Sequence, residues 1–187
     1  MRPLRRIFVD LGANIGSVSE AFGLDHPDHE LIAIEPNIEL LPVIHARSLN
    51  LPRPITVIWA AAWTHNGFID LFKSEHDVAS TVVSGKHEHA EYGWSQIDYK
   101  APTRVPALDI SSWLYRNVRP TDHVIMKMDI EGAEYEVLEK MLVDGSVNLV
   151  AELRCEWHID RFPEIPRSRH DRIVQQVSRC TKLEDWH

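Results

Sequence analysis

Three carboxylates stand where largely apolar runs of this 187-residue chain end. Asp10 follows "IFV", Glu35 follows "LIAI", and Asp129 follows "VIMKM". Such runs are typical of buried strands, and parallel strands bring their carboxyl ends to one edge of a sheet, where ligands bind. We therefore expect Asp10, Glu35 and Asp129 to border one cleft. There, carboxylates can accept hydrogen bonds from hydroxyl and amino groups.

The turn after the first of these acids has the features of a ligand-binding turn. Gly12 and Gly16 let the backbone approach a ligand without obstruction by a Cβ atom. We expect a helix to begin at Ser17, and the first amides of a helix favour a carboxylate or a phosphate. Glu35 lies about 20 residues after the turn, where an acid grips a ribose diol in nucleotide-binding folds. The spacing predicts a nucleoside site.

The residue pattern of the turn favours one nucleoside ligand over another. A dinucleotide turn reads G-x-G-x-x-G, whereas this chain has G-A-N-I-G. An acid two residues before Gly12 suits a cationic or amino-bearing ligand better than a pyrophosphate. S-adenosylmethionine carries both a sulfonium and an α-amino group, so it fits better than NAD. NAD binding and a purely structural turn remain the alternatives.

Several stretches of the chain together resemble the FkbM-type S-adenosylmethionine-dependent methyltransferases, from about Phe8 to Arg154. The stretches that begin at Phe8 and at Ala33 occur across many class I methyltransferases. The stretch around Asp129, which reads K-x-D-I-E-G-A-E after a strand, is characteristic of this family. A run of small residues, "ASTVVSG", also resembles the family. The main stretches are "FVDLGANIGSVS" (8–19), "AIEPN" (33–37), "LDISSWL" (108–114) and "VIMKMDIEGAEYEVLEKM" (124–141).

The resemblance implies a Rossmann-like α/β sandwich with S-adenosylmethionine as cofactor. It also implies methyl transfer to a hydroxyl, commonly on a sugar or a polyketide-like natural product. The predicted cofactor-binding residues are Asp10, Gly12, Ala13, Asn14, Gly16, Glu35, Pro36, Asn37, Ala62 and Asp129. The matched positions of the second motif are Lys127, Asp129, Glu131, Gly132 and Glu134.

The second motif and the strand after it supply the predicted catalytic residues. Asp129 is expected beside the reacting centre, as a cofactor contact or proton acceptor. Lys127 lies on the same face of the strand, and we expect it either to neutralise a carboxylate or to orient the acceptor oxygen. His158 is a candidate general base, because an imidazole titrates near neutral pH. The non-catalytic alternatives are that Asp129 or Glu131 caps the following helix and that His158 is an exposed loop residue.

A metal site is the other chemistry that these residues could form. Asp129, Glu152 and His158 include the oxygen ligands that suit Mg²⁺. Their spacing matches no diagnostic metal motif, so the sequence predicts no bound metal.

The elements that position these residues alternate between strands and helices, which indicates an α/β fold with a mainly parallel sheet and helices on both faces. Strands are expected at 6–12, 31–37, 55–63, 148–154 and 181–186. Helices are expected at 17–23, 38–50 and 168–180. A strand entering a helix is expected over 105–117, and a strand, turn and helix over 123–142.

Two local motifs add detail to this outline. Ser17 and Glu20 have the spacing of a capping box at a helix start. Asn66 and Gly67 suit a tight turn, so the segments on either side are expected to form a hairpin. The polar segment 75–106 shows no helical periodicity and is expected to form a lid or an acceptor-side loop.

The end of the sequence departs from the family that it resembles. A class I methyltransferase sheet normally ends in a two-strand hairpin, and only "TKLEDW" (181–186) is available here. We therefore expect either a shortened strand pair or a homo-oligomer in which another subunit covers the edge.

Composition limits the partners. The net charge of −8 and the pI near 5.7 disfavour nucleic acid. No apolar run approaches the roughly 20 residues of a membrane span, and the basic N-terminus meets Asp10 too early for a signal peptide. The two cysteines, Cys155 and Cys180, are typical of reduced cytosolic thiols. We expect one cytoplasmic domain over 1–187 that acts on a small-molecule or glycan acceptor; a catalytically silent nucleoside-binding domain is the alternative.

Overall fold

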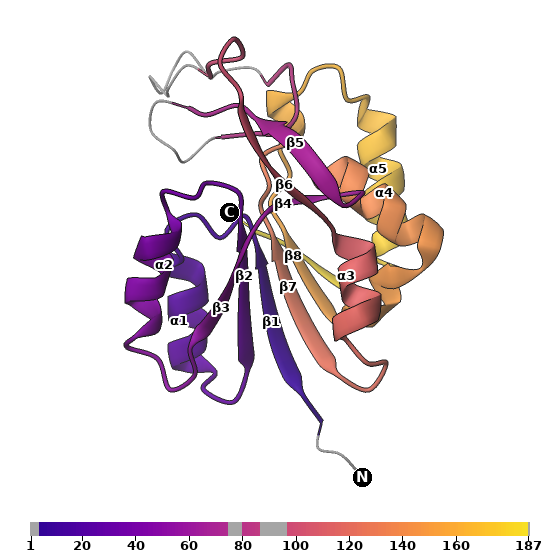
Figure 1. The fold of residues 1–187 in the computed structure, drawn as a ribbon. Coiled ribbons are helices and arrows are strands. Elements are labelled where there is room, and N and C mark those ends of the chain that lie inside the picture. The colour runs from indigo at the N-terminus through magenta and orange to yellow at the C-terminus, as the bar shows by residue number, and fades with distance from the viewer. Residues whose placement is uncertain (1–3, 75–79, 87–96, 187) are drawn as a thin grey trace.

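A six-stranded parallel sheet forms the centre of the molecule (Figure 1). The computed structural model describes residues 4–74, 80–86 and 97–186. In spatial order, the strands are β3 (Ile55–Trp59), β2 (Glu30–Glu35), β1 (Arg6–Leu11), β7 (His123–Met128), β8 (Glu152–Cys155) and β9 (Lys182–Asp185). All neighbouring pairs run parallel. The chain order reverses at β1, which is where open α/β sheets form their ligand crevice.

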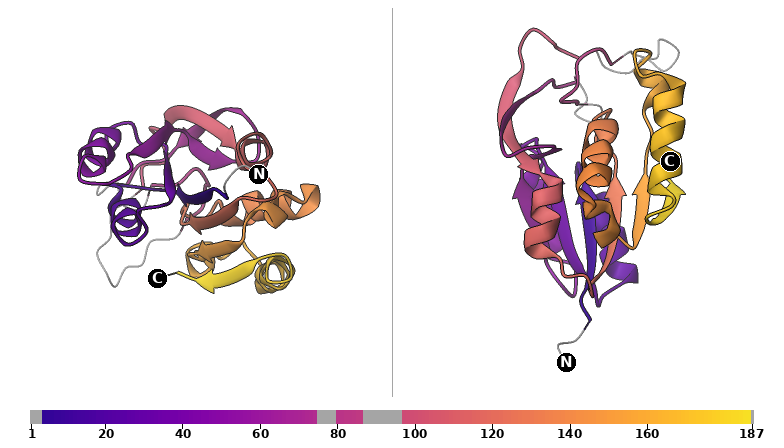
Figure 2. Two further views of the ribbon diagram at one scale, coloured as in Figure 1. Left: turned by 90° about the horizontal axis from the view of Figure 1, so that it is seen from below. Right: turned by 90° about the vertical axis from the view of Figure 1, so that its right-hand side faces the viewer.

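Helices cover both faces of this sheet, as the sequence predicted (Figures 1 and 2). One face carries α1 (Ser17–Asp25) and α2 (Leu41–Ser48); the other carries α3 (Ile110–Asn117), α4 (Glu134–Asp144) and α5 (Arg167–Val177). Short 3₁₀ turns occur at Ser146–Leu149 and Ile159–Arg161. Right-handed crossovers place the helices on opposite faces, because the sheet grows in opposite directions from β1. Within the described residues, no helix has the length and apolar character needed to cross a membrane.

Apolar side chains on the two sides of β1 define the two halves of the core. Ile7, Val9 and Leu11 pack with the cluster under α4 and α5, whereas Phe8 packs with Phe22 of α1. The alternation follows from the two-residue period of a strand. It also places the next even-numbered residue, Asp10, beneath α1.

A second, three-stranded sheet joins the main sheet near its carboxyl ends (Figure 1). Its order is β4 (Ala61–Trp63), β6 (Thr103–Asp109), β5 (Gly67–Leu71). The strand predicted over 55–63 is therefore two strands, one in each sheet. They separate at Ala60, whose amide donates to the Glu35 carbonyl at 3.2 Å.

The predicted hairpin around Asn66 is wrong. β6 lies between β4 and β5, parallel to the first and antiparallel to the second. The Asn66 side chain accepts a hydrogen bond from the amide of Asp109 at 3.2 Å, so it ties the turn to β6. Turn residues show where the chain reverses, but they do not show whether a distant strand inserts.

The start of α1 also differs from the prediction. Gly16 occupies the N-cap position and no side chain caps the helix, so the Ser17–Glu20 capping box is wrong. Glu20 instead pairs with Arg47 of α2. The helix continues past Gly23, where a Cβ atom would lie 2.5 Å from the Leu31 side chain. Gly23 therefore allows close packing of the helix on β2 and does not end the helix.

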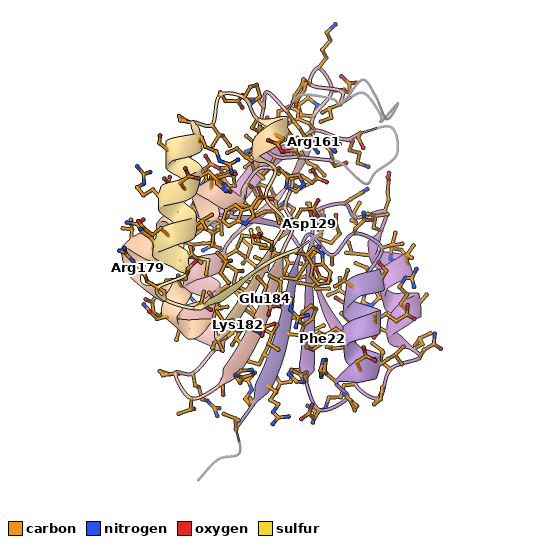
Figure 3. All side chains as sticks on the ribbon, turned by 180° about the vertical axis from the view of Figure 1, so that it is seen from behind. Phe22, Asp129, Arg161, Arg179, Lys182 and Glu184 are labelled. Atoms are coloured by element: carbon orange, nitrogen blue, oxygen red, sulfur yellow. The ribbon has the colours of Figure 1, made fainter. Side chains whose placement is uncertain are left out.

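The last part of the chain keeps its predicted order with shifted boundaries. β8 begins at Glu152 because the preceding residues form a 3₁₀ turn. After α5, the described residues contain the single strand β9, which is parallel to β8. Figure 3 shows Lys182 and Glu184 on this edge strand, and each forms an ion pair with β8. Charged side chains on an edge discourage further strand pairing.

Candidate active site

A pocket of about 570 Å³, including the part open to solvent, lies at the carboxyl ends of β1, β2 and β7. One wall comes from the turns after these strands, and the other comes from the second sheet and the segment 80–86. The lining residues are Gly12, Asn14, Glu35, Pro36, Ala61, Ala62, Leu71, Ser80, Val82, Asp129, Ile130 and Glu131. Glu35 and Asp129, two of the three predicted carboxylates, thus border one pocket.

Glu35 is held in place by backbone amides. Its Oε1 accepts from the amide of Asn37 and its Oε2 from the amide of Asn14, both at 2.8 Å. Each carboxylate oxygen can accept a second hydrogen bond, so Glu35 keeps capacity for two hydroxyl groups. Burial raises the pKa of Glu35 to about 6, although the two amide bonds oppose the shift.

The turn after β1 is held by left-handed backbone conformations. Gly12, Asn14 and Gly16 have φ angles of 74°, 51° and 78°. A Cβ atom on Gly12 would lie 1.9 Å from the carbonyl oxygen of Asp129. Gly12 is therefore required by the close approach of the protein's own second turn. The side-chain oxygen of Asn14, a lining residue, is buried without a hydrogen-bond partner among the described residues.

Asp10 does not border the pocket, contrary to the prediction. It is fully buried, and its Oδ2 accepts from the Ser19 hydroxyl at 2.7 Å. β1 continues to Leu11, so Asp10 lies within the strand and beneath α1. Its other oxygen lies 3.4 Å from Nζ of Lys127, its direct neighbour on β7. Burial raises the pKa of Asp10, and the charge of Lys127 opposes this shift.

Lys127 links the first turn to the second. Its Nζ donates to the Gly12 carbonyl at 2.9 Å and lies 3.1 Å from the Asp129 carboxylate. Burial alone would lower the pKa of Lys127, but Asp10 and Asp129 outweigh it, so that the pKa is raised. Lys127 is only 3% exposed and is not a lining residue, a position that fits charge neutralisation rather than contact with an acceptor.

The D-I-E-G turn is shaped by the buried carboxylate of Glu134. That carboxylate accepts from the amides of Ile130 and Gly132 at 3.0 and 2.9 Å. The alternative that Asp129 or Glu131 caps the helix is therefore wrong. Glu134 meets these amides because Glu131 and Gly132 have φ angles of 56° and 107°. The Asp129 carboxylate is left for the pocket and Lys127.

His158 belongs to the same group and is not an exposed loop residue. It is 7% exposed, and its Nδ1 lies 3.0 Å from Oε1 of Glu134. Its Nε2 lies 3.1 Å from Glu131 and 3.9 Å from Asp129. Burial alone would lower the pKa of His158, but Glu134 and the other carboxylates raise it to about 9. A raised pKa favours the protonated ring, which does not match the neutral imidazole of a general base.

The other predicted residues take supporting places. Gly16, Ala13 and Asn37 shape the two turns without lining the pocket, and their predicted cofactor roles stay predictions. Part of the predicted lid, 75–79 and 87–96, lies outside the described residues. Of the rest, Ser80 and Val82 line the pocket, and the strand β6 begins at Thr103, inside the predicted loop.

Two nearby residues, Leu71 and Glu156, escaped the sequence reasoning. Leu71 reaches the pocket from β5 of the second sheet, whose strand order no local pattern reveals. Glu156 lies beside Asp129, since its amide donates to the Met128 carbonyl at 2.9 Å. The rule that led to the other acids, a carboxylate directly after a strand, would have found Glu156. Glu152 pairs instead with Arg154 and Lys182.

Together, the reversal of strand order at β1, the glycine turn and the acid ending β2 define a Rossmann-like protein with a nucleoside-type site. A family model described as the methyltransferase FkbM domain matches residues 10–182. The chain therefore belongs to the FkbM methyltransferase family, as the resemblance predicted, and is a methyltransferase whose family implies S-adenosylmethionine as methyl donor. No curated protein and no solved structure matches the chain.

Proposed function

We propose that this enzyme transfers the methyl group of S-adenosylmethionine to a hydroxyl of a sugar, a glycan or a natural product. The observation that carries the proposal is the division of one pocket into two ends. Glu35 at one end has two free acceptor positions on a fixed carboxylate, and Asp129 and Glu131 place negative charge at the other. The first suits a ribose diol, and the second suits a hydroxyl that must lose a proton.

The residues present fit the methyl donor. Glu35 would accept from the ribose hydroxyls, and the unpartnered Asn14 oxygen would accept from an amino or hydroxyl group of the ligand. Ala61, Leu71 and Val82 supply an apolar wall for an adenine ring. Asp10 supports this end from below, through Ser19 and Lys127.

The bound donor supplies an electrophilic methyl group, and the protein must align and deprotonate the acceptor. Asp129 is the carboxylate best placed to accept the hydroxyl proton, because it lines the pocket and is partly exposed. Lys127 is a positioning residue whose charge directs the Asp129 carboxylate. His158, whose Nδ1 is fixed by Glu134, is proposed to hold the neighbouring carboxylates in place.

The remaining partners are proposed on charge and composition. The net charge of −8 and the carboxylates of the pocket disfavour a nucleic-acid acceptor. Both cysteines are unpaired, which supports the expected cytoplasmic location. A homo-oligomer stays a prediction.

The test is methyl transfer from isotope-labelled S-adenosylmethionine to sugars and hydroxylated natural products, followed by mass spectrometry. Each hydroxyl acceptor is paired with its amino counterpart. We expect label on hydroxyl oxygen only, and at least a hundredfold loss with Asp129→Asn. Labelled amines alone would contradict O-methylation. S-adenosylhomocysteine binding without turnover of any acceptor would support the silent binding domain instead.

A further inference from the structure

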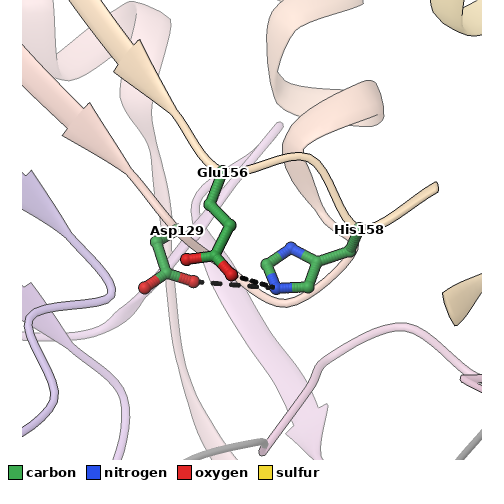
Figure 4. Close-up of side chains that lie close together, drawn as sticks. All are labelled: Asp129, Glu156 and His158. Carbon is green, nitrogen blue, oxygen red and sulfur yellow. Dashed lines mark ion pairs between the residues drawn. The ribbon is translucent and has the colours of Figure 1, made fainter. Parts of the chain in front are cut away.

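Three side chains at the edge of the pocket converge on one point (Figure 4). Asp129 follows β7, whereas Glu156 and His158 follow the neighbouring strand β8. One ligand atom from each lies within 4.8 Å of the other two. We propose that Asp129, Glu156 and His158 bind a divalent metal ion at the acceptor end of the pocket. The sequence predicted no metal, because the spacing of Asp129, Glu152 and His158 matches no diagnostic motif, and Glu156 was not considered.

His158 has the hydrogen-bonding arrangement of a metal-binding histidine. Its Nδ1 is bonded to Glu134, a fully buried carboxylate that is itself fixed by two backbone amides. A carboxylate on one ring nitrogen fixes the ring and directs the other nitrogen to a metal. The other nitrogen, Nε2, faces the pocket carboxylates of Asp129, Glu131 and Glu156, and only 7% of the side chain is exposed. This orientation is the observation that separates the site from an ordinary acidic surface cluster.

The spacing needs only small movements to close around an ion. Nε2 lies 3.7 Å from Oε1 of Glu156 and 3.9 Å from Oδ1 of Asp129. Ligands at about 2.1 Å from a tetrahedral ion lie about 3.4 Å apart. The carboxylate side chains are 26% and 38% exposed for Asp129 and Glu156, so rotation about their side-chain bonds can supply the difference.

Two neighbouring charges decide how the cluster behaves without an ion. Glu131 lies 3.1 Å from Nε2 and also pairs with Lys86, while Lys127 lies 3.1 Å from the other oxygen of Asp129. A protonated His158 could balance these carboxylates by itself. That competing account predicts no cation binding, so the two accounts differ in one measurable property.

One imidazole nitrogen and two carboxylates favour a first-row ion such as Mn²⁺ or Zn²⁺ over Ca²⁺, which prefers oxygen alone. Because Asp129 also lines the pocket, an acceptor hydroxyl could complete the coordination; this part rests on the proposed function. The ion would lower the pKa of the hydroxyl, whose proton would pass to the second oxygen of the Asp129 carboxylate. The oxygen then bonds to the methyl carbon as the carbon–sulfur bond breaks, turning the sulfonium into a neutral thioether.

The test is titration of the metal-stripped full chain with Mn²⁺ and with Zn²⁺, by calorimetry and, for Mn²⁺, by electron paramagnetic resonance. We expect one saturable site, weakened at least tenfold in Glu156→Gln. The matched control Glu152→Gln removes a carboxylate four residues away, whose ion pairs within the described residues are with Arg154 and Lys182. It should bind as wild type. His158→Ala should abolish binding; if it fails to fold, Glu156→Gln decides.

Titration of the same samples with S-adenosylhomocysteine separates the two proposals. Saturable metal binding by neither ion, or equal affinity in Glu156→Gln and wild type, would overturn the metal site. If S-adenosylhomocysteine still binds in that case, the proposed function stands without a metal. Metal binding without S-adenosylhomocysteine binding would support the metal site and count against the proposed function.

Discussion

The two ends of the pocket are held by different forces. At the β2 end, backbone amides of Asn14 and Asn37 fix Glu35. At the β7 end, side chains hold one another by charge: Lys127 lies against Asp129, and His158 lies among carboxylates. Backbone hydrogen bonds are set by local turns, whereas an ion cluster depends on every member being charged. A substitution at the first end should therefore affect one function, and a substitution at the second should affect several.

This contrast gives each end a distinct response. The β2 end should bind the nucleoside with little dependence on distant residues. The β7 end should be sensitive to metal ions and to loss of any one charge. The four predictions below separate these responses.

The largest effect is expected from Asp129→Asn. The amide keeps the size of the side chain but cannot accept a proton, so turnover should fall by about 10²–10⁴-fold. S-adenosylhomocysteine affinity should change by no more than about threefold, because the amides at Glu35 are untouched. Initial rates and calorimetry measure the two quantities. Asp160→Asn, which changes an exposed residue, is the control. Equal losses of turnover in both variants would show that Asp129 takes no part in the chemistry.

Gly12→Ala tests the point where the two turns touch. A Cβ atom there would lie 1.9 Å from the Asp129 carbonyl, so we expect a loss of about 3 kcal/mol or more of unfolding free energy. Gly145→Ala is a matched control, since its φ of 79° is close to the 74° of Gly12 while its nearest neighbour is 3.6 Å away. Gly145→Ala should lower the free energy of unfolding by about 1–2 kcal/mol. Denaturant unfolding gives both values, and similar costs would show that the turns are not in contact.

The pH dependence of ligand binding should report on Glu35. Its pKa of about 6 is raised by burial, so the carboxylate is charged above pH 6 and protonated below it. S-adenosylhomocysteine affinity should fall by up to about tenfold per pH unit below pH 6. For the ligand-free protein the sign is opposite. The fold favours the protonated form of Glu35, and the stability that this preference contributes is lost as pH rises from 4.5 through about 6. Calorimetry from pH 5 to 8 should show a flat profile for Glu35→Gln; an unchanged slope would assign the titration to another group.

The smallest effect is expected from Thr81→Val. The Thr81 hydroxyl donates to the Glu131 carbonyl at 2.6 Å, and its loss should cost about 1 kcal/mol. Thr181→Val is the matched control, because the buried Thr181 hydroxyl has no hydrogen-bond partner in the described part of the chain. Its replacement should be neutral or stabilising. Thermal unfolding compares the two variants, and a larger cost at Thr181 would contradict this assignment.

The sequence predicted the β2 end better than the β7 end for a physical reason. Asn14 and the glycines are placed by the turn between β1 and α1, and Glu35 by the end of β2, and the signals for both are local. Glu156 and His158 meet Asp129 only because β8 pairs with β7 in one register, which places Cys155 beside Met128. The strand was predicted to end at Arg154 and ends at Cys155, so Glu156 was not recognised as the acid that follows it.

The second sheet shows the same limit. Ala61 and Ala62 were expected to end one long strand, and Asn66 a hairpin. Insertion of β6 between β4 and β5 depends on partners more than 30 residues apart, such as Gly67 and Ala107. The fold class follows from alternating strands and helices, whereas the order of the strands requires the tertiary structure.

The central claim is that Glu35 marks a nucleoside site for a methyl donor. The most direct measurement is calorimetric titration of the wild type and Glu35→Ala with S-adenosylhomocysteine, with NAD in parallel and Glu39→Ala, an exposed neighbour, as control. We predict saturable S-adenosylhomocysteine binding, weakened at least tenfold in Glu35→Ala and unchanged in Glu39→Ala, with no NAD binding. Absence of S-adenosylhomocysteine binding at millimolar concentration, or equal binding in all three proteins, would contradict the account.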